Sequence, residues 1–105
     1  MDEKYEMICF QIIAGSGAAK SCYVEAIQKA KIGQFEEVEK LIQDAEEAFV
    51  EVHKIHAQLI QQEAAGNKTE FSLLLMHAED QMASTEMAKL LCNEIVDLYK
   101  KDANK

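Results

Sequence analysis

The sequence contains no proline and only four glycines among its 105 residues. Proline breaks helices and glycine destabilises their interiors, so this scarcity favours long helices and argues against a loop-rich fold. Apolar residues make up 49% of the chain and charged residues 29%, an ordinary balance for a soluble globular protein. A chain of this length is expected to form a single domain over residues 1–105.

Positive charge is also scarce. Lysine and arginine together number 11, all of them lysine, against 19 acidic residues, and the formal net charge is -8. A nucleic-acid-binding surface needs a basic stripe that neutralises phosphates, so no nucleic-acid partner is expected. An acidic protein suits partners that carry basic patches. Without arginine, an anionic group would have to be held by lysine or glutamine side chains, by backbone amides or by a partner protein.

The three cysteines, Cys9, Cys22 and Cys92, are odd in number and contain no C-x-x-C pair. We therefore expect reduced, mostly buried thiols and neither a disulfide framework nor a zinc knuckle. The first residues are charged and are not followed by the apolar core of a signal peptide. No apolar run approaches the roughly 20 residues that cross a bilayer. These features predict a cytoplasmic protein without direct membrane insertion.

Two glycines divide the chain into three segments. Gly33 follows a turn with two lysines, which is typical of the residue just past a helix end. Gly66 has the same character, and Asn67 with Glu70 three residues later has the spacing of a helix N-cap box.

Each segment is about 30 residues long and repeats its apolar residues with helical periodicity. Short connections between long helices make neighbouring helices antiparallel. The sequence therefore predicts an all-α fold, an antiparallel up-down-up three-helix bundle. The predicted helices cover about residues 4–32, 34–65 and 68–101.

The third segment carries two adjacent apolar rows, a face wider than a slender three-helix monomer needs. A row that repeats at about 3.5 residues suits a helix seam between subunits, so the pattern favours self-association. A broad core within one chain is the alternative. The first row consists of Leu73, Met76, Ala83, Met87 and Leu90, and the second of Leu74, Ala78, Ala88, Leu91, Cys92, Ile95 and Tyr99.

Asp80 falls in the middle of the first apolar row. A carboxylate on a packing seam costs several kcal/mol unless a metal, a cation or a proton compensates it. His77 stands three residues earlier, almost a full helical turn away. A neutral imidazole can accept and release a phosphoryl group, it can bind a metal together with Asp80, or it can be a structural residue. The spacing leaves these three alternatives open.

His53 and His56 have the same spacing, but no third zinc ligand accompanies them. We expect both to be packed and hydrogen-bonded. The sequence has neither a G-x-x-x-x-G-K-[ST] loop nor a G-x-S-x-G elbow, so any phosphate chemistry would use phosphate already carried by a protein.

Gly15 and Gly17 lie inside the first predicted helix and together cost about 2 kcal/mol of helix propensity. Such a cost indicates a kink or a close backbone approach. A break between two shorter helices is the alternative.

Four stretches, in order and at matching separations, carry a resemblance to a known family. They are Ile12-Ile13-Ala14-Gly15-Ser16-Gly17-Ala18-Ala19-Lys20-Ser21, Ala30-Lys31-Ile32-Gly33-Gln34-Phe35, Glu51-Val52-His53 leading to Leu59-Ile60, and Met76-His77-Ala78-Glu79-Asp80. Over about residues 8 to 100 the chain resembles the enzyme IIA component of the lactose/cellobiose (and diacetylchitobiose) family of the bacterial sugar phosphotransferase system.

The resemblance implies a three-helix bundle that assembles as a homotrimer. The family's active histidine falls on His77, which would accept phosphate from the histidine-containing phosphocarrier protein and pass it to a cysteine of the cognate IIB component. The IIB and membrane IIC components would then deliver phosphate to a β-linked disaccharide. The family's metal-binding aspartate falls on Asp80, one from each subunit, around a divalent cation such as Mg²⁺ on the threefold axis. The Gly15–Gly17 stretch would pack near the phosphate site.

The chain departs from the family pattern near the site. Family members commonly read His-Ala-Gln-Asp-His, whereas this chain has Glu79 and Gln81, and His56 stands where glutamine is expected. Glu79 lies about 200° around the helix from His77, so its charge need not face the phosphate. Two other classes remain alternatives: a histidine phosphotransfer module of a two-component relay, and a non-catalytic helical adaptor.

Overall fold

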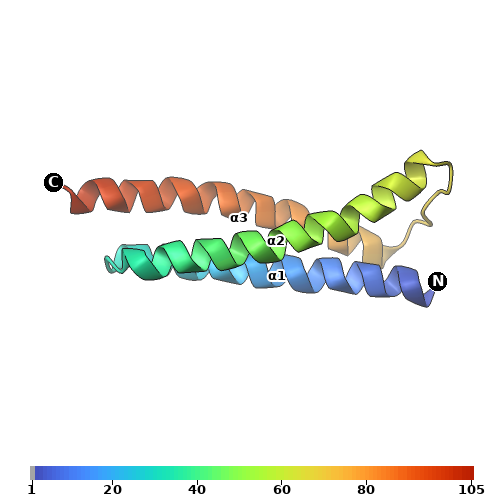
Figure 1. Cartoon of the computed structure of the whole chain (residues 1–105), viewed down its shortest axis with the longest axis horizontal. Helices are drawn as coiled ribbons and strands as arrows, with labels where there is room; N and C mark the ends of the chain where they lie inside the picture. The colour runs from blue at the N-terminus through green and yellow to red at the C-terminus, as the bar shows by residue number, and fades with distance from the viewer. Residues whose placement is uncertain (1) are drawn as a thin grey trace.

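The structure, a computed structural model, describes residues 2–105, and Met1, the first residue of the predicted domain, lies outside them. These residues form three helices and no strand: α1 Glu3–Lys31, α2 Phe35–Ala64 and α3 Leu73–Ala103. The helices lie side by side in a rod of 56 × 21 × 20 Å, and the chain reverses direction at each connection (Figure 1). The predicted all-α three-helix fold is confirmed.

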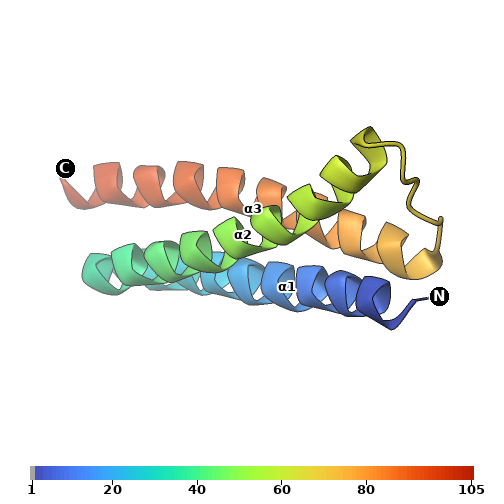
Figure 2. The ribbon, with the colours of Figure 1, turned by 45° about the vertical axis from the view of Figure 1, so that its right-hand side comes forward.

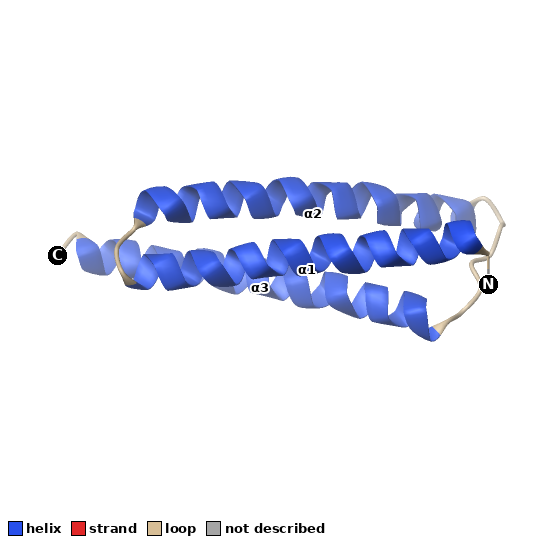
Figure 3. Cartoon of the chain, turned by 90° about the horizontal axis from the view of Figure 1, so that it is seen from below, coloured by secondary structure: helices blue, strands red, loops and turns tan. Residues whose placement is uncertain are grey.

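Helix α1 lies between the other two (Figure 3) and packs along both, whereas α2 and α3 approach each other at few points. Figure 2 shows α2 and α3 diverging toward the loop that joins them. The buried positions of α1 recur every three or four residues, which turns one continuous stripe toward the core. This stripe consists of Cys9, Ile12, Ser16, Ala19, Tyr23, Ala26 and Ala30.

The ends of α1 follow the predicted signals. The Asp2 side chain accepts a hydrogen bond from the Lys4 backbone amide at 3.0 Å and caps the helix start. Gly33 has φ +77°, and its amide donates to the Ala30 carbonyl at 3.1 Å. This left-handed conformation is one that glycine adopts without strain, so Gly33 closes the helix as its position predicted.

The start of the third helix was predicted wrongly. Helix α3 begins at Leu73, not near 68, and its N-cap is Ser72, whose hydroxyl accepts from the Leu75 amide at 3.0 Å. Asn67 belongs to the end of α2, because its amide donates to the Gln62 carbonyl at 3.0 Å. Tyr5 of α1 donates its hydroxyl to the Glu70 carbonyl at 2.6 Å, which holds the preceding loop against the bundle.

Helix α1 runs unbroken through Gly15 and Gly17, so the expected alternative of two shorter helices is wrong. A Cβ at Gly15 would collide with Cγ2 of Val52 in α2. Gly15 therefore permits the close backbone approach that the sequence indicated. A Cβ at Gly17 would meet nothing within 4 Å among the described residues, and nothing within the chain explains this glycine.

By length and composition alone, α1 could cross a membrane, a test that the core helix of a soluble protein also passes. This finding qualifies the prediction that no segment of the chain is apolar enough to cross a bilayer. The buried stripe of α1 packs against the other two helices, as expected of a core helix.

We predict that Gly15→Ala lowers the free energy of unfolding by about 1–3 kcal/mol, because the added methyl overpacks the α1–α2 contact at Val52. Gly17→Ala is the matched control and is expected to gain up to about 1 kcal/mol of helix propensity in the isolated chain. Urea unfolding of both variants measures the difference. Equal effects would contradict a specific contact at Gly15.

The Tyr23 side chain is fully buried, and its hydroxyl has no hydrogen-bond partner among residues 2–105. Burial, with a smaller effect of the Glu46 carboxylate, raises its pKa to about 12. We predict that Tyr23→Phe raises the free energy of unfolding by about 1 kcal/mol, because it removes an unsatisfied polar group.

The raised pKa also predicts a pH dependence. The unfolded tyrosine loses its proton near pH 10 but the folded one only near pH 12, so wild type loses stability across this interval. Thermal unfolding at several pH values should therefore show the advantage of Tyr23→Phe growing above pH 10. Tyr99→Phe, at a half-buried tyrosine of α3, is the matched control. A stability difference between Tyr23→Phe and wild type that stays constant with pH would contradict the raised pKa of Tyr23.

Candidate functional site

His77 is the fifth residue of α3, and its side chain is exposed. Within residues 2–105 its imidazole forms no hydrogen bond or ion pair. An accessible ring nitrogen is the first requirement of a nucleophilic or metal-binding histidine. The geometry therefore disfavours a structural role for His77.

Asp80 is exposed as well, and so is most of the apolar row around it. Leu73, Met87 and Leu90 are 78%, 56% and 59% exposed. Most of the second row lies toward the bundle, with Ala78 and Cys92 completely buried, but Leu91 is 48% exposed. The alternative of one broad intramolecular core is therefore wrong for the first row, which remains open for another molecule to cover.

One turn beyond His77, Gln81 contacts α1. Its side-chain oxygen accepts a hydrogen bond from the Lys20 ammonium at 3.1 Å. The Ser16 carbonyl of α1 also accepts a hydrogen bond from the Thr85 hydroxyl of α3 at 3.0 Å. The stretch of α1 that contains Gly15 and Gly17 is thus connected to α3 by two side-chain hydrogen bonds. Sequence reasoning missed the pairing of Lys20 with Gln81, since no spacing along one chain reveals the register between two helices.

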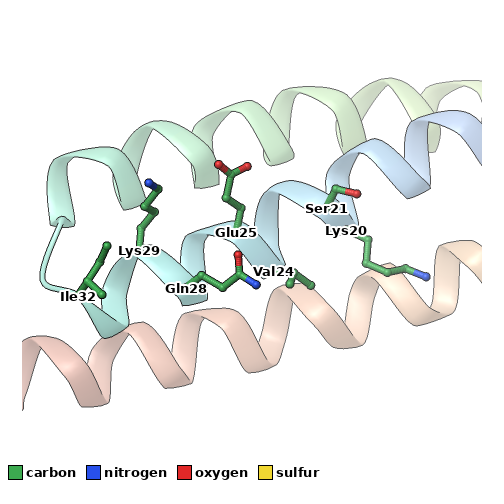
Figure 4. Close-up of a pocket in the computed structure, with 7 residues that line it drawn as sticks. All are labelled: Lys20, Ser21, Val24, Glu25, Gln28, Lys29 and Ile32. Atoms are coloured by element: carbon green, nitrogen blue, oxygen red, sulfur yellow. The ribbon is translucent and has the colours of Figure 1, made fainter.

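Lys20 also marks one end of an open hollow on the surface of α1 (Figure 4). In this view the Lys20 side chain extends away from the rest of the hollow, along α1. The hollow is lined by Lys20, Ser21, Val24, Glu25, Gln28, Lys29 and Ile32.

Glu79 faces away from this side. Its carboxylate lies 3.3 Å from Nε2 of His56 in α2, at ion-pair distance but without hydrogen-bond alignment. The expected hydrogen bond is therefore missing at Nε2 of His56, which is half-buried. Two of the three departures from the family pattern, Glu79 and His56, therefore face each other. The added charge of Glu79 is directed to α2 and not toward His77.

His53 is packed as predicted. Its ring stands edge-on to Phe49 at a centroid distance of 4.4 Å, and its Nδ1 lies 2.8 Å from the Phe49 carbonyl oxygen. Its Nε2 lies 3.0 Å from the Glu86 carboxylate. Both partners are hydrogen-bond acceptors, so only the protonated imidazolium can donate to both.

Residues 2–105 contain no group of three or more histidine, cysteine or acidic side chains placed to hold a metal. Asp80 has no cationic partner within this part of the chain. A single exposed carboxylate is an oxygen ligand that suits a hard divalent cation, but a complete site needs ligands from more than one copy or several waters. The donor set of one chain is thus compatible with a shared cation and too small for a site of its own.

The three cysteines are free. Cys9 and Cys92 are buried, and this burial raises the pKa of both thiols. Neither thiol is suited to act as a nucleophile near neutral pH.

A family model for the lactose/cellobiose-specific IIA subunit of the phosphotransferase system (PTS) matches residues 7–100. The chain belongs to this family. It is 46% identical to an oligo-beta-mannoside-specific EIIA component of Bacillus subtilis over 90% of its own length and 86% of that protein. It is 44% identical to the lichenan-specific phosphotransferase enzyme IIA component of the same organism, over 96% of this chain and 92% of that protein.

Two solved structures are similar over nearly the whole chain. The cellobiose-specific enzyme IIA of Bacillus anthracis superposes with a TM-score of 0.95 at 44% identity, covering 100% of this chain and 96% of that one. The IIA(Chitobiose)–HPr complex of Escherichia coli gives a TM-score of 0.81 at 29% identity, over 95% of this chain and 97% of that one. The chain is therefore a IIA component, a phosphotransferase component of the sugar PTS.

Proposed function

We propose that this IIA component is a phosphohistidine carrier for sugar uptake, with His77 as the residue that is phosphorylated. The observation that supports this choice is the exposed imidazole of His77, free of internal partners, on a helix that the family match includes. His53 lies against a carbonyl and a carboxylate, and His56 is more buried and faces Glu79. His77 is the exposed histidine whose ring nitrogens have no partner within residues 2–105.

The donor in this proposal is the histidine-containing phosphocarrier protein, and the acceptor is a cysteine of the cognate IIB component. A similar IIA protein from Escherichia coli forms a complex with HPr, which supports the first partner. In the first step, a ring nitrogen of neutral His77 attacks the phosphorus atom of the donor phosphohistidine. One P–N bond forms while the other breaks, and the leaving imidazole keeps the electron pair. Each ring keeps the proton on its other nitrogen.

In the second step, the cysteine thiolate of IIB attacks the same phosphorus atom. A P–S bond forms, the P–N bond to His77 breaks, and His77 returns to its neutral state. The IIB and IIC components would then pass the group to an incoming β-linked disaccharide. We also propose that the IIA component meets both partner proteins in the cytoplasm.

A two-component phosphotransfer module is disfavoured, because such modules typically use four helices and the described chain has three. A non-catalytic adaptor would use the exposed apolar face of α3 but would not require His77.

We also propose that the chain acts as a homotrimer that is joined through the exposed apolar row of α3. One Asp80 from each copy would then meet near the threefold axis. Like charges brought together in a low dielectric repel strongly. A divalent cation, for which Mg²⁺ is the best candidate, would offset this repulsion when bound. Within each chain, the exposed position of Asp80 among apolar side chains supports this arrangement.

We predict that wild type, incubated with phosphoenolpyruvate, enzyme I and the phosphocarrier protein, gains the mass of one acid-labile phosphate. His77→Gln should gain none, because it lacks the nucleophile. The control His53→Gln should gain one phosphate, as wild type does. Intact-mass spectrometry measures all three. Phosphorylation of folded His77→Gln, or none of wild type, would contradict the proposed site.

We predict that a chelator weakens self-association of wild type at least about tenfold, because it leaves the Asp80 charges uncompensated. Asp80→Asn removes these charges and should form trimers that are insensitive to the chelator. Asp97→Asn, at another exposed aspartate of α3, should behave as wild type. Sedimentation velocity measures the association, and wild-type monomers in the presence of Mg²⁺ would contradict the trimer.

A further inference from the structure

A phosphoryl group in transfer carries negative charge that nearby cationic donors stabilise. This chain has no arginine, so lysine is its only permanently charged donor. Four lysines lie next to carboxylates: Lys29 to Glu37, Lys54 to Glu51, Lys100 to Glu39 and Lys105 to Asp102. Their charge is already compensated, and the first and third of these pairs lie well away from His77 along the bundle.

The other seven lysines form no ion pair within residues 2–105, and among these seven Lys20 is the one whose ammonium is hydrogen-bonded to a side chain of α3. Its ammonium is hydrogen-bonded at 3.1 Å to the Gln81 amide oxygen, a neutral acceptor, and it forms no ion pair within residues 2–105. The side chain is half-buried, so its position is restricted by its neighbours. A positive charge is thus held on the surface of α3 by a group that does not neutralise it.

The position of Gln81 brings this charge to the side of His77. Residues four apart on a helix are neighbours, separated by about 6 Å along the axis and about 40° around it. Helical side chains also lean toward the N-terminus, so Gln81 leans toward His77. Figure 4 shows Lys20 extending along α1 beside α3, in the direction of the N-terminal half of α1.

Glu79 does not compete for Lys20. It lies about 200° around the helix from His77, and its carboxylate is directed to His56. Gln81 itself stands where the family pattern has a histidine. Lys20 brings a cation from α1 to this same position of α3.

We propose that Lys20 contacts the phosphoryl group on His77 during transfer and that Gln81 positions the Lys20 ammonium for this contact. This inference rests on the proposed function. Lys20 is then a catalytic residue and Gln81 a positioning residue. As the P–N bond to His77 forms and the donor bond breaks, the ammonium stabilises the charge on the equatorial oxygens. No proton leaves Lys20.

The experiment measures single-turnover transfer from the phosphorylated carrier protein to wild type and variants, over a range of carrier concentrations. Lys20→Met should lower the limiting rate constant about 10- to 100-fold, as expected for loss of one charged donor. Lys20→Arg should restore most of the rate, and Gln81→Leu should lower it by a smaller factor. Lys29→Met is the matched control, because it removes the same charge from the same helix, nine residues away.

The rate constant at saturating carrier protein distinguishes an effect on the transfer step from an effect on the electrostatic encounter of the two proteins. Both methionine variants make the net charge more negative by one, so they change the encounter with a basic partner similarly. Only Lys20→Met should change the rate at saturation. Thermal unfolding of each variant reports on folding, and if Lys20→Met is unstable, Lys20→Gln is compared with Lys20→Arg in its place.

The outcomes distinguish the two proposals. If wild type is not phosphorylated, or is phosphorylated elsewhere than His77, the proposed function fails. If wild type is phosphorylated on His77 and folded Lys20→Met transfers within twofold of the wild-type rate, the role of Lys20 is overturned while the carrier function stands. The role of Lys20 is also overturned if Lys20→Arg transfers the phosphoryl group as slowly as Lys20→Met.

Discussion

The packing of α1 is the constraint on which the rest of the structure depends. Within residues 2–105, α1 is the helix that packs along both of the others. Small side chains recur in its buried stripe, among them Ala19 and Ala26, and Gly15 lets α2 approach so closely that Val52 occupies the space of a Cβ. Because α1 carries the core contacts on both sides, α3 is free to leave one apolar row exposed.

The seam between α2 and α3 is held differently. Side-chain pairs bridge it where the helix backbones stand apart: His53 with Glu86, His56 with Glu79, and Lys100 with Glu39. Exposed ion pairs contribute little stability, typically about 0–1 kcal/mol each. Here these pairs orient side chains, because they keep the carboxylates of Glu79 and Glu86 turned toward α2. The face of α3 that carries His77 therefore has fewer negative charges next to it than the composition suggests.

Most of the fold was predictable from local signals. Apolar periodicity and the positions of Gly33 and Gly66 predicted three helices, and the structure has them. The start of α3 was missed because Asn67 and Ser72 are both good N-cap residues, and the tertiary hydrogen bond from Tyr5 to the loop between them is not visible in the local sequence. Asp80 and His77 drew attention because they conflict with, or stand beside, an apolar row. The pairing of Lys20 with Gln81 could not be predicted, since it depends on how two helices are aligned.

The later start of α3 changes the electrostatic setting of His77. A helix beginning near residue 68 would place His77 deep in its third turn, where the backbone dipoles have no net effect. With Ser72 as the cap, His77 is the fifth residue, and its side chain leans back over the first turn. The amide groups of that turn carry the positive end of the helix dipole, which favours a nearby anion by about 0.3–1 kcal/mol. The serine that ends the loop thus also makes the backbone of α3 a more favourable neighbour for the phosphoryl group that we propose on His77.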